Sequence, residues 1–379
     1  MSKVINIESV KDTTLYKELE KRNNADTKAF VGNILTLCDE ASDRAKQIPK
    51  FFSEYTLHDK THFIRVTELM AYVLGNSLKE LNDIEIGLLI LSAFYHDQGM
   101  LIDENEYKSL DENEGYLLFR DNWIIDHANY SEIRKQFESS FISTEERERL
   151  SSIIRELDAA MLTDFLRESH GQRSHDYVLS TFTSERILSV AGSNISNHLA
   201  KICLSHVKSA EWISGANGLN YDENIGAYKV NAIFLSIVLR LADILDFDSD
   251  RTPDVLFKSI HFTSPVSISE WQKHRDVNGW EISNELIRFT MYFEHPVYEK
   301  TAHVFLDWID SELNHCHALL RKFPASVSSY KIEVAEKVDR SRLGPKGNSY
   351  LYHDLEFTPS RPRLSRCLCN RDADVLSLP

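Results

Sequence analysis

Long apolar runs, a secretory leader and a phosphate-binding glycine loop are all missing from this sequence. No hydrophobic stretch reaches the roughly eighteen residues that a membrane-spanning helix needs. The first residues, MSKVINIESVKDTTLYKELEKRNN, are polar and charged, unlike a signal peptide. The thirteen glycines are scattered, and none belongs to a G-x-x-x-x-G-K motif. The sequence therefore predicts a cytoplasmic protein that does not bind membranes, and it excludes a P-loop nucleotide site.

The chain is also poor in cysteine. Its five cysteines are odd in number and scattered, which fits a reducing cytoplasm better than a disulfide framework. Cys367 and Cys369 form a C-x-C pair, but no second metal-spaced pair accompanies them. We therefore expect neither disulfides nor a metal site at this pair.

Basic residues are outnumbered by acidic ones, and the formal net charge is −15. A nucleic-acid coat normally presents an excess of Lys and Arg, so this balance disfavours nucleic acid as a partner without excluding a local basic groove. The same balance suits a site that collects divalent cations. With 42% hydrophobic and 27% charged residues, the composition is that of an ordinary globular protein.

Helical periodicity dominates the first 250 residues. We expect an N-terminal helical segment at 1–48 and a helical core at 49–250. Within the core, residues 84–94 (IEIGLLILSAF) are apolar on all sides, which predicts a central buried helix. Further core helices are expected at 195–207 and 230–245. Residues 103–165 are acidic with weaker repeats, and they predict an insertion of peripheral helices.

The periodicity of the apolar residues changes after residue 250. Ile287, Phe289, Met291 and Phe293 alternate with polar residues, which predicts a strand, and a helix is expected at about 298–321. Residues 251–330 therefore predict a small α+β appendage. From 338 onward the sequence is basic, rich in turn residues and without period, so 331–379 is expected to be an irregular tail. The predicted fold class is mainly α, a helical bundle with a small α+β C-terminal appendage.

Six residues on or near these helices could hold divalent metal. Imidazoles and carboxylates that converge from rigid elements suit such ions, and the candidates are His62, His96, Asp97, His170, His206 and Asp243. Structural alternatives exist for several of them. His62 could face solvent, and His96 could complement the dipole at a helix C-terminus. Asp243 lies among leucines and isoleucines in LRLADILDFD, and a buried carboxylate there needs a cation or hydrogen bonds.

The ordered set of these residues resembles a known family. HFIRV, which contains His62, is similar to an H-x-x-x-V motif of the HD superfamily of metal-dependent phosphohydrolases. FYHDQGM resembles that family's buried helix ending in HD, and LRLADILDFD resembles its closing R-x-A-D-x-L-D. The match covers about 50–250 and implies an HD-type helical bundle. Other His-Asp dipeptides, such as His58-Asp59 and His175-Asp176, are interpreted as chance matches.

The resemblance also implies roles for two further groups. In two-metal HD enzymes, extra histidines occur where this chain has His170 and His206, so these would hold a second ion with Asp97 as the bridge. His206 as a buried core histidine is the structural alternative. The spacing in LHDKTH resembles the YHNxxH of cyclic-nucleotide phosphodiesterases, which would make His58 a proton donor to the leaving group, although an aspartate replaces the asparagine.

Arginines are the candidates for binding substrate phosphate. Arg173 and Arg251 are the predicted ligands, and Arg167 is a weaker one, because guanidinium can grip phosphate through two hydrogen bonds. Surface ion pairs with the many acidic residues are the alternative for each arginine.

Three functions fit this pattern. The favoured one is a phosphohydrolase that acts on a nucleotide or cyclic nucleotide with one or two ions of Mn²⁺, Fe²⁺ or Mg²⁺. The alternatives are an HD-type nuclease on single-stranded nucleic acid and a non-catalytic metal-bound sensor or scaffold. The segment with Trp271, His274, Trp280 and His295 is similar to bacterial HD proteins fused to GHKL-type ATPase modules. That similarity implies an ATPase partner, a role in anti-phage defence, and a chain shortened from a larger architecture.

Overall fold

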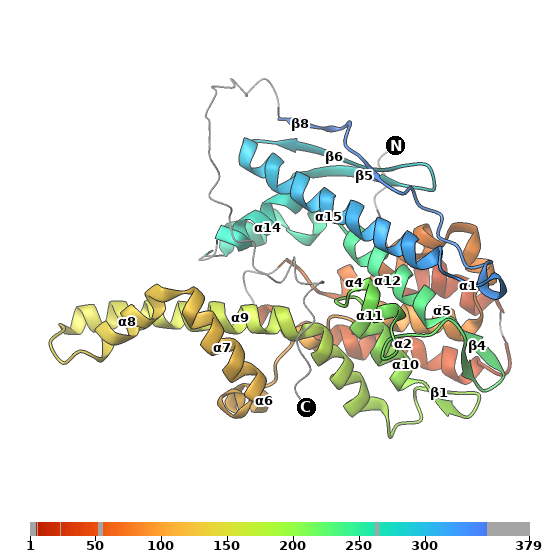
Figure 1. Ribbon diagram of the computed structural model, residues 1–379, viewed down its shortest axis with the longest axis horizontal. Coiled ribbons are helices and arrows are strands. Elements are labelled where there is room, and N and C mark those ends of the chain that lie inside the picture. The colour runs from red at the N-terminus through yellow and green to blue at the C-terminus, as the bar shows by residue number, and fades with distance from the viewer. Residues whose placement is uncertain are drawn as a thin grey trace.

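The computed structural model describes residue 5 and residues 7–22, 24–51, 56–260, 262 and 265–346. The predicted fold class is confirmed: the protein is mainly α, with a small α+β part at its C-terminal side (Figure 1). No helix among the described residues combines the length and apolar character needed to cross a bilayer.

The centre of the bundle is α5 (Asp83–Tyr95), and every one of its residues is buried. Asn82 caps its N-terminus in a capping box with Glu85. Around α5 pack α1 (Thr14–Arg22), α2 (Lys28–Ala45), α4 (Lys60–Leu74), α10 (Ser196–Ser205) and α12 (Ala232–Leu245). The predicted central helix at 84–94 is therefore confirmed.

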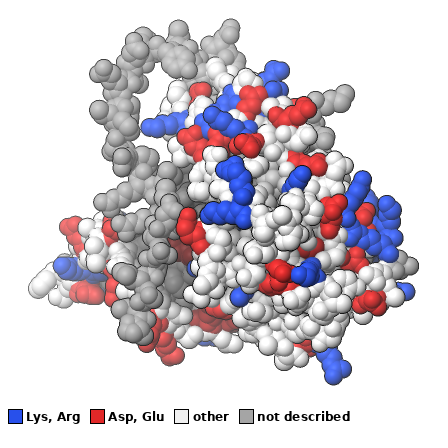
Figure 2. Space-filling view, turned by 45° about the vertical axis from the view of Figure 1, so that its right-hand side comes forward, with Lys and Arg blue, Asp and Glu red and all other residues white. Residues whose placement is uncertain are grey.

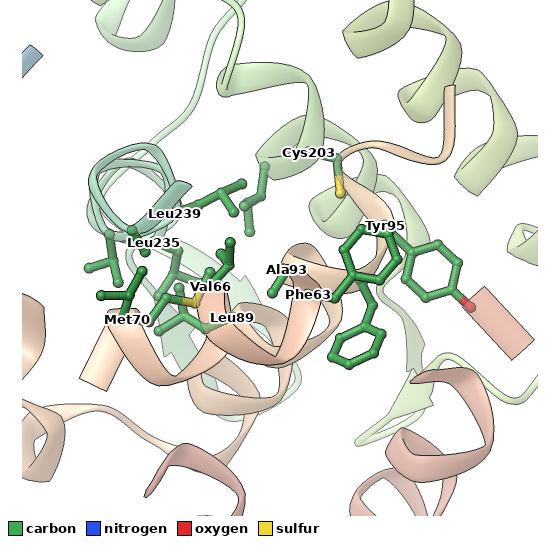
Figure 3. Packing of buried hydrophobic residues seen from close by; sticks show 14 of the residues in the cluster. Phe63, Val66, Met70, Leu89, Ala93, Tyr95, Cys203, Leu235 and Leu239 are labelled. Carbon is green, nitrogen blue, oxygen red and sulfur yellow. The ribbon is translucent and has the colours of Figure 1, made fainter. Parts of the chain in front are cut away.

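Interdigitated apolar side chains hold this bundle together. Figure 3 shows Val66 and Met70 of α4, Leu89 of α5, and Leu235 and Leu239 of α12 in one continuous cluster. The relative solvent exposure of all five residues is 0%. Such packing fixes the ends of the helices relative to one another, which is where side chains for a preorganised site have to start.

Short elements connect the helices of the bundle. They are η1 (Val10–Asp12), α3 (Ile48–Phe51), η2 (Gly75–Glu80), η3 (Gln98–Met100), α11 (Ala210–Ser214) and two hairpins, β1 (Ser189–Val190) with β2 (Ser193–Asn194) and β3 (Glu223–Ile225) with β4 (Tyr228–Val230). The described cysteines Cys38, Cys203 and Cys316 are buried and form no disulfide with one another. Cys367 and Cys369 lie outside the described residues.

The predicted insertion is helical and forms an arm that projects from the bundle (Figure 1). It contains α6 (Glu104–Lys108), η4 (Leu110–Glu112), α7 (Glu114–Asp126), α8 (Ala128–Glu138) and the first half of α9 (Thr144–Phe182). Trp123, Tyr130 and Met161 form a small core of its own. Because α9 runs unbroken across residue 165, the arm and the bundle share one helix.

The C-terminal part is a four-stranded sheet covered by α15 (Pro296–Leu320). β5 (Val277–Ile282) pairs antiparallel with β6 (Ile287–Phe293), whose four predicted inward residues are all fully buried. Parallel to β6 run β7 (Val338–Asp339) and β8 (Leu343–Pro345). The remaining elements are η5 (Ser249–Arg251), α13 (Asp254–Ser259), α14 (Pro265–Arg275) and η6 (Ala325–Val327). The prediction that the chain is irregular from 338 is wrong for 338–345, because the open edge of β6 pairs with this segment.

Candidate metal centre

Helix ends supply most of the candidate ligands. His62 lies in the first turn of α4, whose N-cap is Asp59; the Asp59 carboxylate accepts hydrogen bonds from the backbone N–H groups of Thr61 and His62. In the His58-Asp59 dipeptide, Asp59 is therefore a helix-capping residue. His96 is the C-cap residue of α5, and Asp97 follows it.

The first ligand group consists of His62, His96 and Asp97, all buried. The Asp97 Oδ2 atom lies 3.6 Å from His62 Nε2 and 3.1 Å from His96 Nε2. Asp243, in the last turn of α12, brings its Oδ1 atom to 3.6 Å from each of the same two nitrogens. Four side chains from three elements thus surround one point.

The second ligand group shares Asp97. Its other oxygen, Oδ1, lies 3.7 Å from His170 Nε2 and 3.7 Å from His206 Nε2. His170 comes from the middle of α9, and His206 is the C-cap residue of α10. The structure brings together all six residues that the sequence predicted as ligands, with Asp97 between the two histidine pairs.

The hydrogen bonds of the imidazoles fit a cation. Nδ1 of His62 donates to Asp246 at 2.7 Å, and Nδ1 of His96 donates to the Ala93 carbonyl at 3.0 Å. Their Nε2 atoms have no hydrogen-bond partner among the described residues, although both are buried. Once deprotonated, these two nitrogens and the carboxylates that they face would form a donor set for a divalent ion.

The two buried carboxylates at the centre, Asp97 and Asp243, also favour a positive charge beside them. Burial would lower the pKa of His96, but Asp97 and Asp243 outweigh it and raise this pKa to about 10. Burial opposes the ionisation of Asp97, yet His96 and His62 hold the pKa of this carboxyl well below its usual range. A proton on His96 thus neutralises the two carboxylates in the way that a bound cation would.

Burial and the neighbouring imidazoles act on the second group in the opposite direction. Burial, together with His170 and His96, lowers the pKa of His206 to about 3. A neutral imidazole is the form that binds metal, so His206 needs no deprotonation at neutral pH.

Sequence reasoning missed the residues that orient His62. Asp246, the C-cap residue of α12, accepts from His62 and from Arg65 Nε at 2.7 Å each. Arg65 also pairs with Asp248 and Asp250 at 2.9 and 3.1 Å. This network fixes the tautomer of His62, as carboxylates behind metal-binding histidines do. The signal was present, because Asp246 is the last residue of the R-x-A-D-x-L-D motif and Arg65 interrupts an apolar helix.

The helix α9 also holds the His96-Asp97 corner. Ser174 Oγ donates to the His96 carbonyl at 2.5 Å and accepts from Gly99 N–H at 2.8 Å. A Cβ atom on Gly99 would collide with the backbone of α9 at His170, so only glycine allows this approach. Arg173 donates to the carbonyls of Gly99 and Leu101 and pairs with a carboxylate of α6. In this arrangement Arg173 stabilises the turn that follows Asp97. Its expected contact with substrate remains a prediction.

A buried arginine holds the end of α10. Arg240 of α12 donates to the carbonyls of Ser205 and Lys208, on either side of His206, and pairs with Glu312 of α15 at 2.6 Å. Both charged side chains are 1% exposed. Arg240 therefore ties His206 to the helix that carries Asp243.

His58 and Arg251 lie together beside the first group. Nδ1 of His58 donates to the Thr56 carbonyl at 2.7 Å, and its Nε2 accepts from Arg251 at 3.1 Å. His58 Nε2 is 3.8 Å from Asp97 Oδ2. Burial, reinforced by the charge of Arg251, lowers the pKa of His58 to about 3. The structure thus places both residues next to the ligands; their catalytic and substrate-binding roles remain predictions.

The fold and this site define a class. A His, a His-Asp pair and an Asp around one point of a helical bundle make the chain an HD-domain protein, and its ligand groups fit a metal-dependent hydrolase. The family model HD-CE matches residues 52–315, and the protein belongs to the HD-CE family. No curated protein and no solved structure matched the chain. The expected link to GHKL-type ATPase modules remains a prediction.

Proposed function

We propose that this protein is a phosphohydrolase that cleaves a phosphoester or phosphoanhydride of a nucleotide or cyclic nucleotide with the help of one or two divalent ions. The observation that carries the proposal is the sharing of Asp97: one oxygen faces His62 and His96, and the other faces His170 and His206. A bridging carboxylate between two histidine pairs is suited to two ions that act on one phosphoryl group.

The ligands divide between two positions. His62, His96, Asp97 and Asp243 would hold one ion, and Asp97, His170 and His206 the other. Divalent ions held there would supply an activated water and stabilise negative charge on the phosphoryl group. Imidazole and carboxylate accept Mn²⁺, Fe²⁺ and Mg²⁺, so the ligand types alone do not choose among these.

The chain's own residues would position the substrate and move protons. Arg251 would bind a substrate phosphate, and the position of its guanidinium beside His58 supports this role. His58 would protonate the leaving oxygen only after its Nε2 atom, now an acceptor from Arg251, has taken a proton from water. A phosphate that draws Arg251 away would free this nitrogen for proton transfer.

A hydrolysis panel tests the proposal. Metal-loaded protein is incubated with nucleoside triphosphates, cyclic mononucleotides, cyclic dinucleotides and single-stranded DNA, beside Asp97→Ala. Hydrolysis of a nucleotide class that disappears in Asp97→Ala supports the phosphohydrolase. Cleavage of DNA alone would instead identify a nuclease. Silence across the panel in protein that carries metal would overturn the proposal in favour of a non-catalytic sensor.

Surface charge guides the order of these tests. On the face shown in Figure 2, the basic and acidic side chains of the described residues are interspersed. A nuclease would be expected to gather its basic residues along the path of the strand. Nucleotides therefore come first in the panel. A GHKL-type ATPase partner, a cytoplasmic location and a role in anti-phage defence are further parts of the proposal, to be tested separately.

A further inference from the structure

Two polar residues of α14, Lys273 and His274, are buried next to the metal centre and have no part in it. Each is 4% exposed. They belong to the C-terminal α+β part, whereas all the ligands come from the helical bundle. Burying an ammonium group and an imidazole side by side is unfavourable unless something compensates their polarity.

Packing places both residues at the edge of the site. α14 packs against η5, the element that carries Arg251. The His274 ring contacts the ring of Phe247, with centroids 5.1 Å apart, and Phe247 directly follows Asp246. Lys273 Nζ lies 3.9 Å from the centroid of Phe305, which in turn packs on Phe247. One aromatic cluster thus joins α14 to the segment that orients His62.

Hydrogen-bond donors at this edge are incompletely used. Arg251 Nε is buried and has no hydrogen-bond partner among the described residues. His274 Nδ1 also lacks one, but burial lowers the pKa of this imidazole well below its usual range, so this nitrogen is an acceptor. Lys273 pairs with Glu270 at 2.6 Å, but an ammonium group has three N–H donors. One carboxylate therefore leaves donor capacity on two neighbouring side chains, Lys273 and Arg251.

The charges are also unbalanced. Burial lowers the pKa of Lys273, and after the opposing effect of Glu270, the nearby guanidinium groups of Arg251 and Arg167 lower it further. A buried Lys273–Glu270 pair is the structural alternative, and Arg167 pairs with Asp164 at 3.5 Å, so the imbalance concerns Arg251. Arg251 approaches a second carboxylate, that of Asp246, only to 3.9 Å. Neighbouring cationic side chains are typical of sites that bind phosphate.

We infer that Lys273 and Arg251 form a subsite for a second, non-reacting phosphate group of the substrate. His58 Nε2 lies 3.1 Å from Arg251 and 3.8 Å from Asp97, so a phosphate at the ligands would have its neighbour within reach of the subsite. This inference rests on the proposed function and narrows it. The substrate class is one with two or more phosphates, such as a nucleoside polyphosphate or a cyclic dinucleotide, and nucleoside monophosphates are excluded.

Calorimetric binding measures the subsite without turnover. Metal-loaded full-length protein is titrated with inorganic pyrophosphate and with orthophosphate, and the metal content of every variant is determined. We expect pyrophosphate to bind about tenfold or more tightly than orthophosphate, and Lys273→Gln to lose most of this preference with its metal retained. Arg275→Gln is the matched control, because Arg275 lies on the same helix and pairs with Asp254 at the surface.

A second variant distinguishes loss of the subsite from misfolding of the protein. Glu270→Gln removes the carboxylate that competes for Lys273, so it should bind pyrophosphate more tightly than wild type, which a damaged fold would not do. Equal affinities of wild type for the two anions, or a pyrophosphate preference unchanged in Lys273→Gln, would overturn the inference. Neither result depends on hydrolysis, so the subsite and the proposed activity can fail independently. Titrations with a nucleoside triphosphate and a cyclic dinucleotide then distinguish the two substrate sources.

Discussion

The Nε2 atoms of His170 and His206 lie 2.8 Å apart, although they come from different helices. The Nδ1 atom of each ring donates to a backbone carbonyl three residues earlier, that of Arg167 or Cys203. In neutral rings these bonds leave an Nε2 lone pair on each histidine, and both lone pairs point to the same place. Such an arrangement is stable when a cation or a shared proton lies between the rings.

Removing one of these rings should empty one metal position. His206→Ala is expected to lower the bound metal by one equivalent, because Asp97 and His170 alone are too few ligands to compete with water. Metal analysis after dialysis measures the stoichiometry. His315→Ala, which removes an exposed histidine of α15, should keep the wild-type value. An unchanged stoichiometry in His206→Ala would exclude the second position.

The carboxylate behind His62 should tune the first position. In Asp246→Asn an amide replaces the carboxylate that accepts from both His62 and Arg65. Metal affinity should fall by about 10- to 100-fold, as is usual for such outer partners. Competition with a fluorescent chelator provides the measurement. Asp250→Asn is the control, because Asp250 pairs with the same arginine at a largely exposed position. Equal affinities in the two variants would contradict the role of Asp246.

Metal binding should depend on pH through His96. Its pKa of about 10 means that the metal-free site carries a proton at neutral pH, and binding must displace it. Affinity should therefore rise with pH, by roughly tenfold per unit for one displaced proton, and level off only near pH 10. Titrations at pH 6, 7 and 8 test this slope. An affinity that is flat over this range would show that no proton leaves.

The hydroxyl of Ser174 should matter for stability. Ser174→Ala leaves the buried His96 carbonyl and Gly99 N–H without this partner, so the free energy of unfolding should fall by about 1–3 kcal/mol. Denaturant unfolding gives this value. Ser180→Ala, at an exposed position of the same helix, should change it by less than about 0.5 kcal/mol. Similar losses in both variants would argue against a special role for Ser174.

The buried pair of Arg240 and Glu312 offers a test with a built-in rescue. Arg240→Met leaves the charged Glu312 carboxylate in the core without its arginine, and the free energy of unfolding should fall by about 3–5 kcal/mol. The double variant with Glu312→Met should recover part of that loss, because no buried charge remains. Thermal or denaturant unfolding measures both. A double variant less stable than Arg240→Met would contradict this account.

The ligands could be predicted because their residue types stand out. An aspartate among leucines in α12, or a His-Asp pair after a wholly apolar helix, is costly to bury unless a cation or hydrogen bonds meet it. The structure brings these residues together. Helices with strong periodicity, such as α5, could be predicted for the same reason: burial on every side leaves a continuous apolar run.

Pairing between residues far apart in the chain could not be predicted from the sequence. β7 and β8 span two and three residues, and only the open edge of β6 makes strands of them. The partner of Arg173 is Glu106, 67 residues away, and nothing in the local sequence announces that pair. The continuity of α9 across residue 165 was missed because the change in composition there suggested a boundary. Gly171 within this helix leaves room for Val207 of the neighbouring segment.

The shared helix makes the arm a poor candidate for modular engineering. α9 spans 39 residues, about 58 Å at 1.5 Å per residue, and His170 lies in its second half. Cutting the chain at Thr144 would uncover Leu150, Ile154 and Met161, which α7 and α8 now help to bury. Cutting further along would shorten the helix that carries His170. Truncated or fused variants should therefore keep residues 104–182 together.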